Sequence, residues 1–191
     1  MLDQGTIQHE LRPELGPGER LLWSGMPRQG VVFRPIDLFL IPFILLWAGI
    51  PTFAALGLLK SDRGVGIGDF FFLPFILIGA YLLVGRFIVD AKQRARTFYG
   101  VTNQRILIVR TWWRRRTTSL KLGFLPDVTL TEGRNGRGVI QFGTDRWPGA
   151  GWFGGGWPGN AQAMSPRFEL AEDVRAVYDA IIRAQADLSR G

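Results

Sequence analysis

Two long apolar runs divide the chain into three parts. Residues 38–59 contain no charged side chain, residues 70–85 contain none either, and the ten residues between these runs are mostly polar or glycine. A helix needs roughly 20 apolar residues to cross a hydrocarbon core of about 30 Å. The first run has this length, and the second reaches it through residues 87–89 if Arg86 extends along the helix toward the headgroups. The pattern predicts a transmembrane helical hairpin over residues 36–91, with spans of about 37–59 and 69–89.

The alternative to this hairpin is a pair of buried helices in a soluble protein. A core helix of a soluble protein usually carries a polar stripe, and neither apolar run has one. Pro42, Pro51 and Pro74 favour the alternative weakly, but proline is tolerated in spans where neighbouring groups satisfy the backbone. We therefore expect two membrane spans.

Positive charges lie at the outer ends of the two runs rather than in the loop between them. Arg20, Arg28 and Arg34 precede the first run, and loop 60–69 holds two cations and two acids. The cations that follow the second run are Arg86, Lys92, Arg94, Arg96 and Arg105. The positive-inside rule then predicts a multi-pass protein of the plasma (inner) membrane with both termini cytoplasmic. Residues 1–35 form a polar N-terminal segment without the features of a signal peptide.

Residues 92–191 change to short alternating segments, which predict a cytoplasmic α+β domain. The alternation predicts strands at 97–101, 104–111, 117–122, 127–131, 139–142 and 167–169. Apolar residues then recur at helical spacing from Leu170 to Leu188, which predicts a closing amphipathic helix. The expected architecture is an antiparallel β-barrel or sandwich. Because the second strand is apolar on both faces, we expect the core to cover one face and the membrane or a partner chain to cover the other.

A motif in this domain resembles a known family. Tyr99-Gly-Val-Thr102-Asn103-Gln-Arg105 is similar to the Tyr-x-Leu/Val-Thr-Asn/Asp-x-Arg signature of the bacterial pleckstrin-homology (PH) domain family. Residues 18–27 resemble the segment that precedes a two-helix hairpin in these proteins, and residues 138–142 and 168–178 resemble their late strand and closing helix. The resemblance implies a PH-like fold in a family of small membrane proteins of mostly unassigned function. The insertion at 147–160 departs from the family pattern.

We expect the signature residues to serve the fold. Thr102 and Asn103 suit a tight turn, because their side chains bond local amides. Tyr99 is expected to pack on the core, and Arg105 to pair with a carboxylate such as Asp127.

Composition excludes several kinds of chemistry. The chain has no cysteine, which removes disulfides and thiolate chemistry, and His9 is its one histidine, so we expect no metal and no cofactor. The sixteen acids are scattered, and helix capping explains the densest group, Glu169, Glu172 and Asp173. Neither a nucleophile elbow nor a phosphate-binding loop is present. We therefore do not expect an enzyme.

The net charge of +7 is concentrated in one region: residues 91–126 hold nine cations and no acid. Such a block beside the inner leaflet attracts anionic lipid by about 1 kcal/mol per cation. The expected tip between the second and third strands joins tryptophan, which prefers the headgroup level, to arginine, which binds phosphate. The candidate headgroup residues are Lys92, Arg94, Arg96, Trp112, Trp113, Arg114, Arg115 and Arg116. The alternative is a solvated loop that merely reinforces topology.

A second candidate surface is the loop at residues 147–160, in which Trp-Pro-Gly occurs twice. Its aromatic residues are Trp147, Trp152, Phe153 and Trp157. Permanent exposure of these rings to water is costly, so the loop is expected to meet the bilayer or a partner. A loop packed on its own domain is the alternative.

These observations predict a non-enzymatic integral membrane protein with a basic domain at the cytoplasmic leaflet. The domain binds anionic lipid headgroups or a membrane-protein partner, in an accessory, scaffold or assembly role, and sheet edges allow a homo-oligomer. One alternative is a membrane-anchored nucleic-acid-binding module, although the cations crowd toward the bilayer. Another is a component of an oligomeric transporter or channel, although the spans lack internal charges.

Overall fold

The computed structural model describes residues 3–60, 66–146 and 164–190. The described helices are α1 (Gln4–Leu11), α2 (Asp37–Leu59), α3 (Leu73–Ala80), α4 (Arg86–Ala95) and α7 (Val174–Arg190). The described strands are β1 (Leu21–Gly25), β2 (Thr97–Thr102), β3 (Arg105–Arg110), β4 (Arg116–Lys121), β5 (Val128–Glu132), β6 (Gly138–Phe142) and β7 (Arg167–Leu170). A π-helical turn at Tyr81–Gly85 joins α3 to α4.

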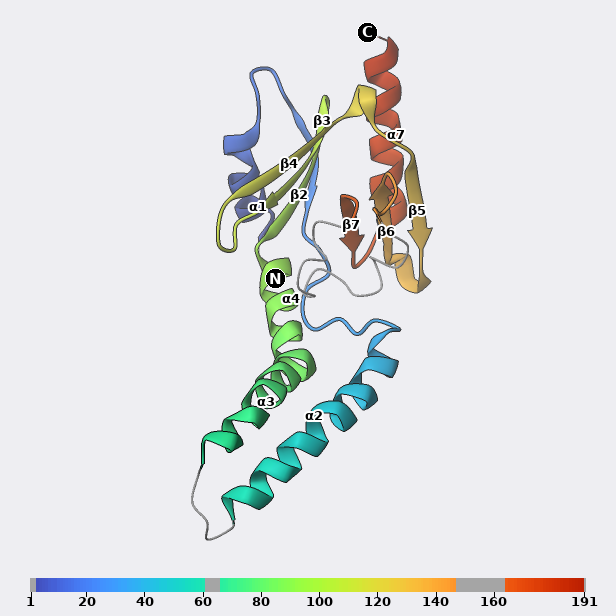
Figure 1. The fold of residues 1–191 in the computed structure, drawn as a ribbon. Helices are drawn as coiled ribbons and strands as arrows, with labels where there is room; N and C mark the ends of the chain where they lie inside the picture. The colour runs from blue at the N-terminus through green and yellow to red at the C-terminus, as the bar shows by residue number, and fades with distance from the viewer. Residues whose placement is uncertain (1–2, 61–65, 147–163, 191) are drawn as a thin grey trace.

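Helices α2 and α3–α4 form a hairpin that projects away from the strands (Figure 1). By length and composition, Asp37–Leu58 and Phe70–Ala95 are long and apolar enough to cross a membrane, and only 11% of each apolar window is buried inside the protein. Gly79 of α3 lies against Ala48 of α2. The two helices approach so closely there that a Cβ atom on Gly79 would clash with the Cβ atom of Ala48. The described part of the chain therefore contains two apolar helices with their surfaces largely uncovered.

The described strands form two antiparallel sheets: a four-stranded sheet in the order β1-β2-β3-β4 and a three-stranded sheet in the order β5-β6-β7. The six strands and the closing helix predicted from the sequence are all present, so the α+β architecture is confirmed. Of the two expected forms, the described strands make two separate sheets and no closed barrel. The main core contains side chains of both sheets and of α7, among them Tyr99, Ile140, Phe142, Phe168 and Ile181.

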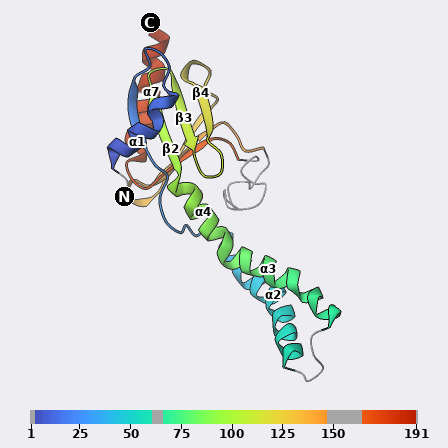
Figure 2. The same ribbon diagram turned by 90° about the vertical axis from the view of Figure 1, so that its left-hand side faces the viewer.

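The N-terminal segment completes the larger sheet. Strand β1 pairs antiparallel with β2, and α1 lies against the sheet (Figure 2). Ile7 and Leu11 of α1 cluster with Phe98 and Val109, which lie on the sheet face that points away from the main core. The expectation that membrane or a partner chain covers this face is wrong, because the chain's own first helix does so.

A buried ion pair ties together the two legs of the hairpin where they meet the strands. Arg86 donates to the Asp37 carboxylate at 2.6 Å, and the other oxygen of Asp37 accepts the backbone N–H of Arg34 at 2.7 Å. The guanidinium also lies 4.5 Å above the ring of Phe87, and Arg86 is 5% exposed. The guanidinium of Arg86 is therefore held by a carboxylate 49 residues earlier in the chain, a partner that the sequence analysis did not predict.

Candidate functional site

The signature residues form the turn between β2 and β3 and attach the N-terminal segment to it. The Thr102 hydroxyl accepts the backbone N–H of Arg105 at 2.9 Å and donates to the Glu19 carboxylate at 2.7 Å. Asn103 exchanges two hydrogen bonds with Arg20: its side-chain oxygen accepts the Arg20 N–H at 2.8 Å, and its own N–H donates to the Arg20 carbonyl at 3.1 Å. These contacts are structural.

Arg105 pairs with Glu19 and not with Asp127, so that expectation is wrong. Its Nε and Nη2 atoms donate to the two carboxylate oxygens of Glu19 at 2.9 and 2.8 Å. The Glu19 side chain is 1% exposed. The hydrogen bonds from Arg105 outweigh burial and lower the pKa of Glu19 to about 2. Glu19 was not a candidate from the sequence, because its partners follow it by more than 80 residues.

Tyr99 joins the core to the polar region described below. Its ring stacks on Phe168 with a centroid separation of 4.3 Å, and its hydroxyl oxygen accepts the backbone N–H of Glu169 at 3.4 Å. Burial, together with the negative charge of Glu169, raises the pKa of Tyr99, so the hydroxyl keeps its hydrogen. That hydrogen has no acceptor among the residues that the structure describes.

A cleft of about 520 Å³ opens between the two sheets beside α4. Its walls come from α4, from the adjoining ends of β2, β3 and β4, and from β6 and β7 with the residues that flank them. Tyr99, Ile108 and Phe142 supply apolar surface. Six arginines and two carboxylates of the described chain supply the charge, so the lining is strongly cationic.

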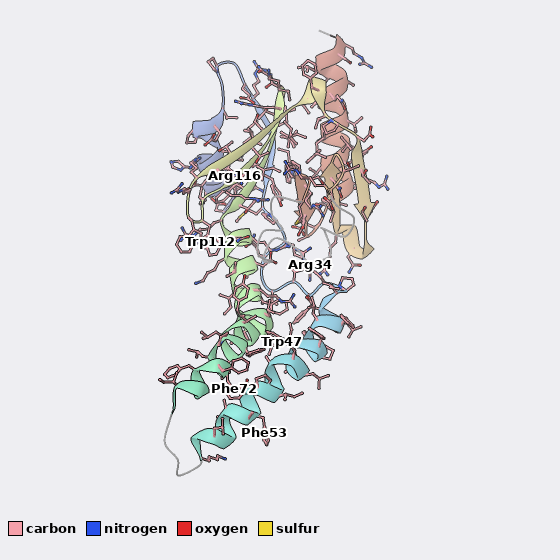
Figure 3. The ribbon with its side chains drawn as sticks, in the orientation of Figure 1. Arg34, Trp47, Phe53, Phe72, Trp112 and Arg116 are labelled. Carbon is pink, nitrogen blue, oxygen red and sulfur yellow. The ribbon has the colours of Figure 1, made fainter. Side chains whose placement is uncertain are left out.

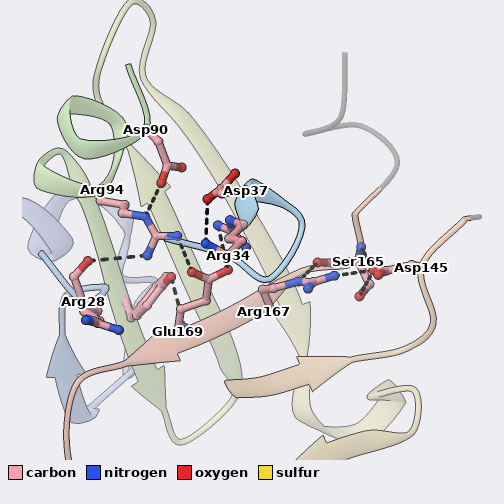
Figure 4. Close-up of polar contacts among 10 residues, drawn as sticks. Arg28, Arg34, Asp37, Asp90, Arg94, Asp145, Ser165, Arg167 and Glu169 are labelled. Atoms are coloured by element: carbon pink, nitrogen blue, oxygen red, sulfur yellow. Dashed lines mark hydrogen bonds and ion pairs between the residues drawn. The ribbon is translucent and has the colours of Figure 1, made fainter. Parts of the chain in front are cut away.

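Part of the cleft lining is held in ion pairs, and we call these paired residues the closed half of the cleft (Figure 4). Arg94 donates to Asp90 at 2.9 Å and to Glu169 at 2.5 Å, and Arg34 lies 3.8 Å from Glu169. Burial acts to raise the pKa of Glu169, but the positive charges of Arg94 and Arg34 outweigh it and hold that pKa below its ordinary value. Arg94 is thus buried and paired, and its assignment as a headgroup residue is wrong. Glu169 belongs to β7, so the prediction that it caps the last helix is also wrong.

Arg167 completes this closed half. Its guanidinium pairs with Asp145, whose carboxylate also accepts the backbone N–H and the hydroxyl of Ser165 at 2.9 and 3.0 Å. Three arginines of the lining, Arg34, Arg94 and Arg167, thus pair with three carboxylates: Asp90 and Glu169 of the lining, and Asp145 behind it. These six side chains together carry no net charge.

The lining arginines without a carboxylate partner in the described chain form what we call the open half of the cleft. Arg110 at the end of β3 and Arg116 at the start of β4 are directly opposite one another in the sheet register. Both are exposed, both line the cleft, and Arg146 lines it from beyond β6. None of these three makes an ion pair with a carboxylate in the described ranges. Like charges directly opposite on neighbouring strands are destabilising, so the fold itself gives no reason for this pair.

The tip between β3 and β4 lies beside the C-terminal end of α4, where α4 leads into β2 (Figure 3). The backbone N–H of Thr111 donates to the Arg96 carbonyl at 2.9 Å, and Trp113 is 84% exposed. Trp112 is half-buried, with its ring 5.6 Å from that of Trp113. The sequence thus predicts the position of this tip correctly.

The cations around the tip differ in availability. Lys92, Arg96 and Arg114 are exposed, and no contact to a carboxylate is found for them within the described segments. Arg115 instead donates to Glu14 at 2.8 Å and to Glu10 at 3.3 Å. Arg115 therefore links the tip to the N-terminal segment. Its side chain is less available to a lipid headgroup than those of Lys92, Arg96 and Arg114.

The structure does not describe the remaining candidates. Trp147, Trp152, Phe153 and Trp157 lie outside the described residues. Residues 3–60, 66–146 and 164–190 contain no cluster of three or more metal-ligating side chains. Comparisons with protein-family models, with curated proteins and with solved structures find no match to this chain.

Proposed function

We propose that this protein is a non-enzymatic membrane-anchored module whose open cleft and tip bind the phosphate-bearing headgroups of anionic lipids. The observation that carries the proposal is the opposed pair Arg110 and Arg116, which is unbalanced by carboxylates in the described chain and lines a cleft. An arginine fork binds phosphate oxygens with two parallel hydrogen bonds. A bound phosphate also removes the repulsion between the two guanidiniums.

The anchor in this proposal is the helical hairpin. Helix α2 has 23 residues and spans about 34 Å, which exceeds the hydrocarbon thickness of about 30 Å. The apolar side chains of both helices are largely uncovered by protein, as lipid-facing surfaces are. The excess of cations at the outer ends of the hairpin supports a cytoplasmic location for both termini and for the strands.

Sheet topology supports a lipid-facing position for the tip. In an antiparallel sheet of order β1-β2-β3-β4, the β1–β2 and β3–β4 connections lie at the same end. The hairpin is the first of these connections and the tip is the second. The tip therefore faces the same membrane surface into which the hairpin inserts.

The near edge of the cleft lies at the height of the lipid headgroups. We take Arg86, where the apolar run ends, as the boundary. Asp90 and Arg94 line the cleft from one and two helical turns further on, about 6 and 12 Å along α4. A headgroup layer is about 5–8 Å thick on each side of the bilayer. The headgroup layer thus reaches the level of Asp90, at the near edge of the cleft, and Arg94 lies about 4 Å beyond it.

The basic surface is not needed for recruitment. Two apolar helices already anchor the chain, since many of their residues contribute about 0.3–0.6 kcal/mol each to insertion. The cations instead orient the strands on the anionic surface and select a headgroup. The order of the elements, with a four-stranded sheet, a three-stranded sheet and a closing helix, supports a PH-like fold for the strands.

The test is the lipid that remains bound to the full chain after gentle detergent extraction, measured by native mass spectrometry. The wild-type protein is expected to retain anionic phospholipid. The double variant Arg110→Gln/Arg116→Gln is expected to retain at least about tenfold less of this lipid, because each charge-assisted hydrogen bond contributes about 1.5–3 kcal/mol.

The matched control is Arg137→Gln/Arg183→Gln, which removes the same charge from exposed positions outside the cleft. Equal lipid retention by the two double variants would contradict the proposal. Binding of single-stranded oligonucleotides with a steep salt dependence, in place of lipid, would favour the nucleic-acid alternative.

A further inference from the structure

We infer that the open half of the cleft selects a phosphomonoester dianion over a phosphodiester. This inference rests on the proposed function and specifies its ligand class. The ligand it predicts is a group with a terminal phosphate, carried either by a lipid or by a soluble molecule.

The charge balance of the cleft is the first reason. The closed half is neutral, with three arginines against three carboxylates. The open half holds Arg110, Arg116 and Arg146, a charge of +3 without a compensating carboxylate in the described segments. A phosphodiester carries a charge of −1, whereas a phosphomonoester carries about −1.5 to −2 near neutral pH. The dianion leaves less of this charge uncompensated.

The supply of hydrogen-bond donors is the second reason. Arg110 and Arg116 project from directly opposite positions on adjacent strands, so both forks start from neighbouring positions on one face of the sheet. The hydroxyls of Thr118 and Thr144 line the same cleft, as does Tyr99, whose hydrogen has no acceptor in the part of the chain that the structure describes. A phosphomonoester presents three terminal oxygens as acceptors, and a phosphodiester presents two. The larger acceptor set matches the donors better.

The apolar surface of the cleft is the third reason. Ile108 and Phe142 line it next to the arginines, and Phe142 is 2% exposed. Apolar surroundings lower the local dielectric constant and strengthen charge-assisted hydrogen bonds. Because Arg110, Arg116 and Arg146 are themselves exposed, this effect is smaller than those of the charge balance and the donor set.

The experiment uses the full chain in uncharged detergent micelles. Isothermal titration calorimetry measures the dissociation constants of dioctanoyl phosphatidic acid, dioctanoyl phosphatidylglycerol and glycerol 3-phosphate at pH 7.5. Phosphatidic acid is expected to bind at least about tenfold more tightly than phosphatidylglycerol, the gain from one further charge-assisted hydrogen bond. At pH 5, below the second phosphate pKa of about 6, this preference is expected to fall.

Single variants locate the effect. Arg110→Gln and Arg116→Gln are each expected to remove the preference, and Arg137→Gln, outside the cleft, to keep it. Without ligand, Arg110→Gln is expected to be at least as thermally stable as the wild type, since it relieves a like-charge pair. A retained fold with lost preference excludes misfolding as the cause.

The outcomes separate the two levels of the proposal and the two sources of phosphate. Tight binding of phosphatidic acid with weak binding of glycerol 3-phosphate supports a lipid ligand, and equal binding of the two supports a soluble one. Equal affinity for phosphatidic acid and phosphatidylglycerol, lost in Arg110→Gln, overturns the selectivity but keeps the headgroup site. Affinities that no cleft variant changes overturn both.

Discussion

Glu19 shows at the residue scale how one carboxylate holds distant parts of this chain together. It accepts hydrogen bonds from Arg105, from the Thr102 hydroxyl and from the backbone N–H of Gly16. The turn chemistry of Thr102 and Asn103 follows from the sequence, because their side chains bond nearby amides. The identity of the Arg105 partner does not follow from it, since a short motif contains no information on which remote carboxylate will meet it.

The lowered pKa of Glu19 predicts an acid-sensitive contribution to stability. Its pKa is about 2 in the folded chain and 4.5 ordinarily. The stabilisation is therefore complete above pH 4.5 and is lost as the pH falls toward 2. The full difference corresponds to about 3 kcal/mol, of which about 2 kcal/mol is lost by pH 3.

Denaturant unfolding of the wild type and Glu19→Gln at pH 7 and pH 3 measures this contribution. The wild type is expected to exceed the variant at pH 7 by more than it does at pH 3. A difference in the free energy of unfolding that is the same at both pH values would show that the Glu19 carboxylate does not stabilise the fold through its charge.

At the scale of elements, the strands that alternate strongly were predictable and the N-terminal elements were not. Period-two alternation identified β2 and β4 to β7, and β3 was identified as a short run that is apolar on both faces. Strand β1 is five residues long, and α1 contributes two buried side chains, Ile7 and Leu11. Apolar patterns as short as these two are not recognised as a strand and a helix in the sequence. A fragment that begins at residue 92 would lack both, and the apolar outer face of β2 and β3 would lose its cover.

The packing of α1 gives a prediction for Leu11. This side chain is fully buried against the sheet, so Leu11→Ala is expected to destabilise the protein by about 2–5 kcal/mol. Leu22→Ala is the matched control, because Leu22 is 53% exposed, and its effect is expected to stay below about 0.5 kcal/mol. The measurement is the denaturant midpoint of each variant in detergent. Equal midpoints for the two variants would show that α1 is not part of the stable fold.

At the scale of the whole molecule, the apolar runs and the tip were predictable, but the cleft was not. Arg110 was not a candidate from the sequence, and the register of β3 and β4 places it opposite Arg116. Arg146 and Glu169 belong to the second sheet region, and only the packing of the sheets beside α4 brings them close. The same packing assigns Arg94 to an internal ion pair, which a count of juxtamembrane charges cannot reveal.

The proposed arrangement of the hairpin across the membrane is the central claim, and cysteine accessibility tests it most directly. The chain has no native cysteine, so a single Lys60→Cys or Ser189→Cys substitution gives one labelling site in the full protein. A membrane-impermeant maleimide is expected to label Lys60→Cys in intact cells, and Ser189→Cys after permeabilisation but not before. Labelling of Ser189→Cys in intact cells, or release of either protein from membranes by carbonate, would contradict the account.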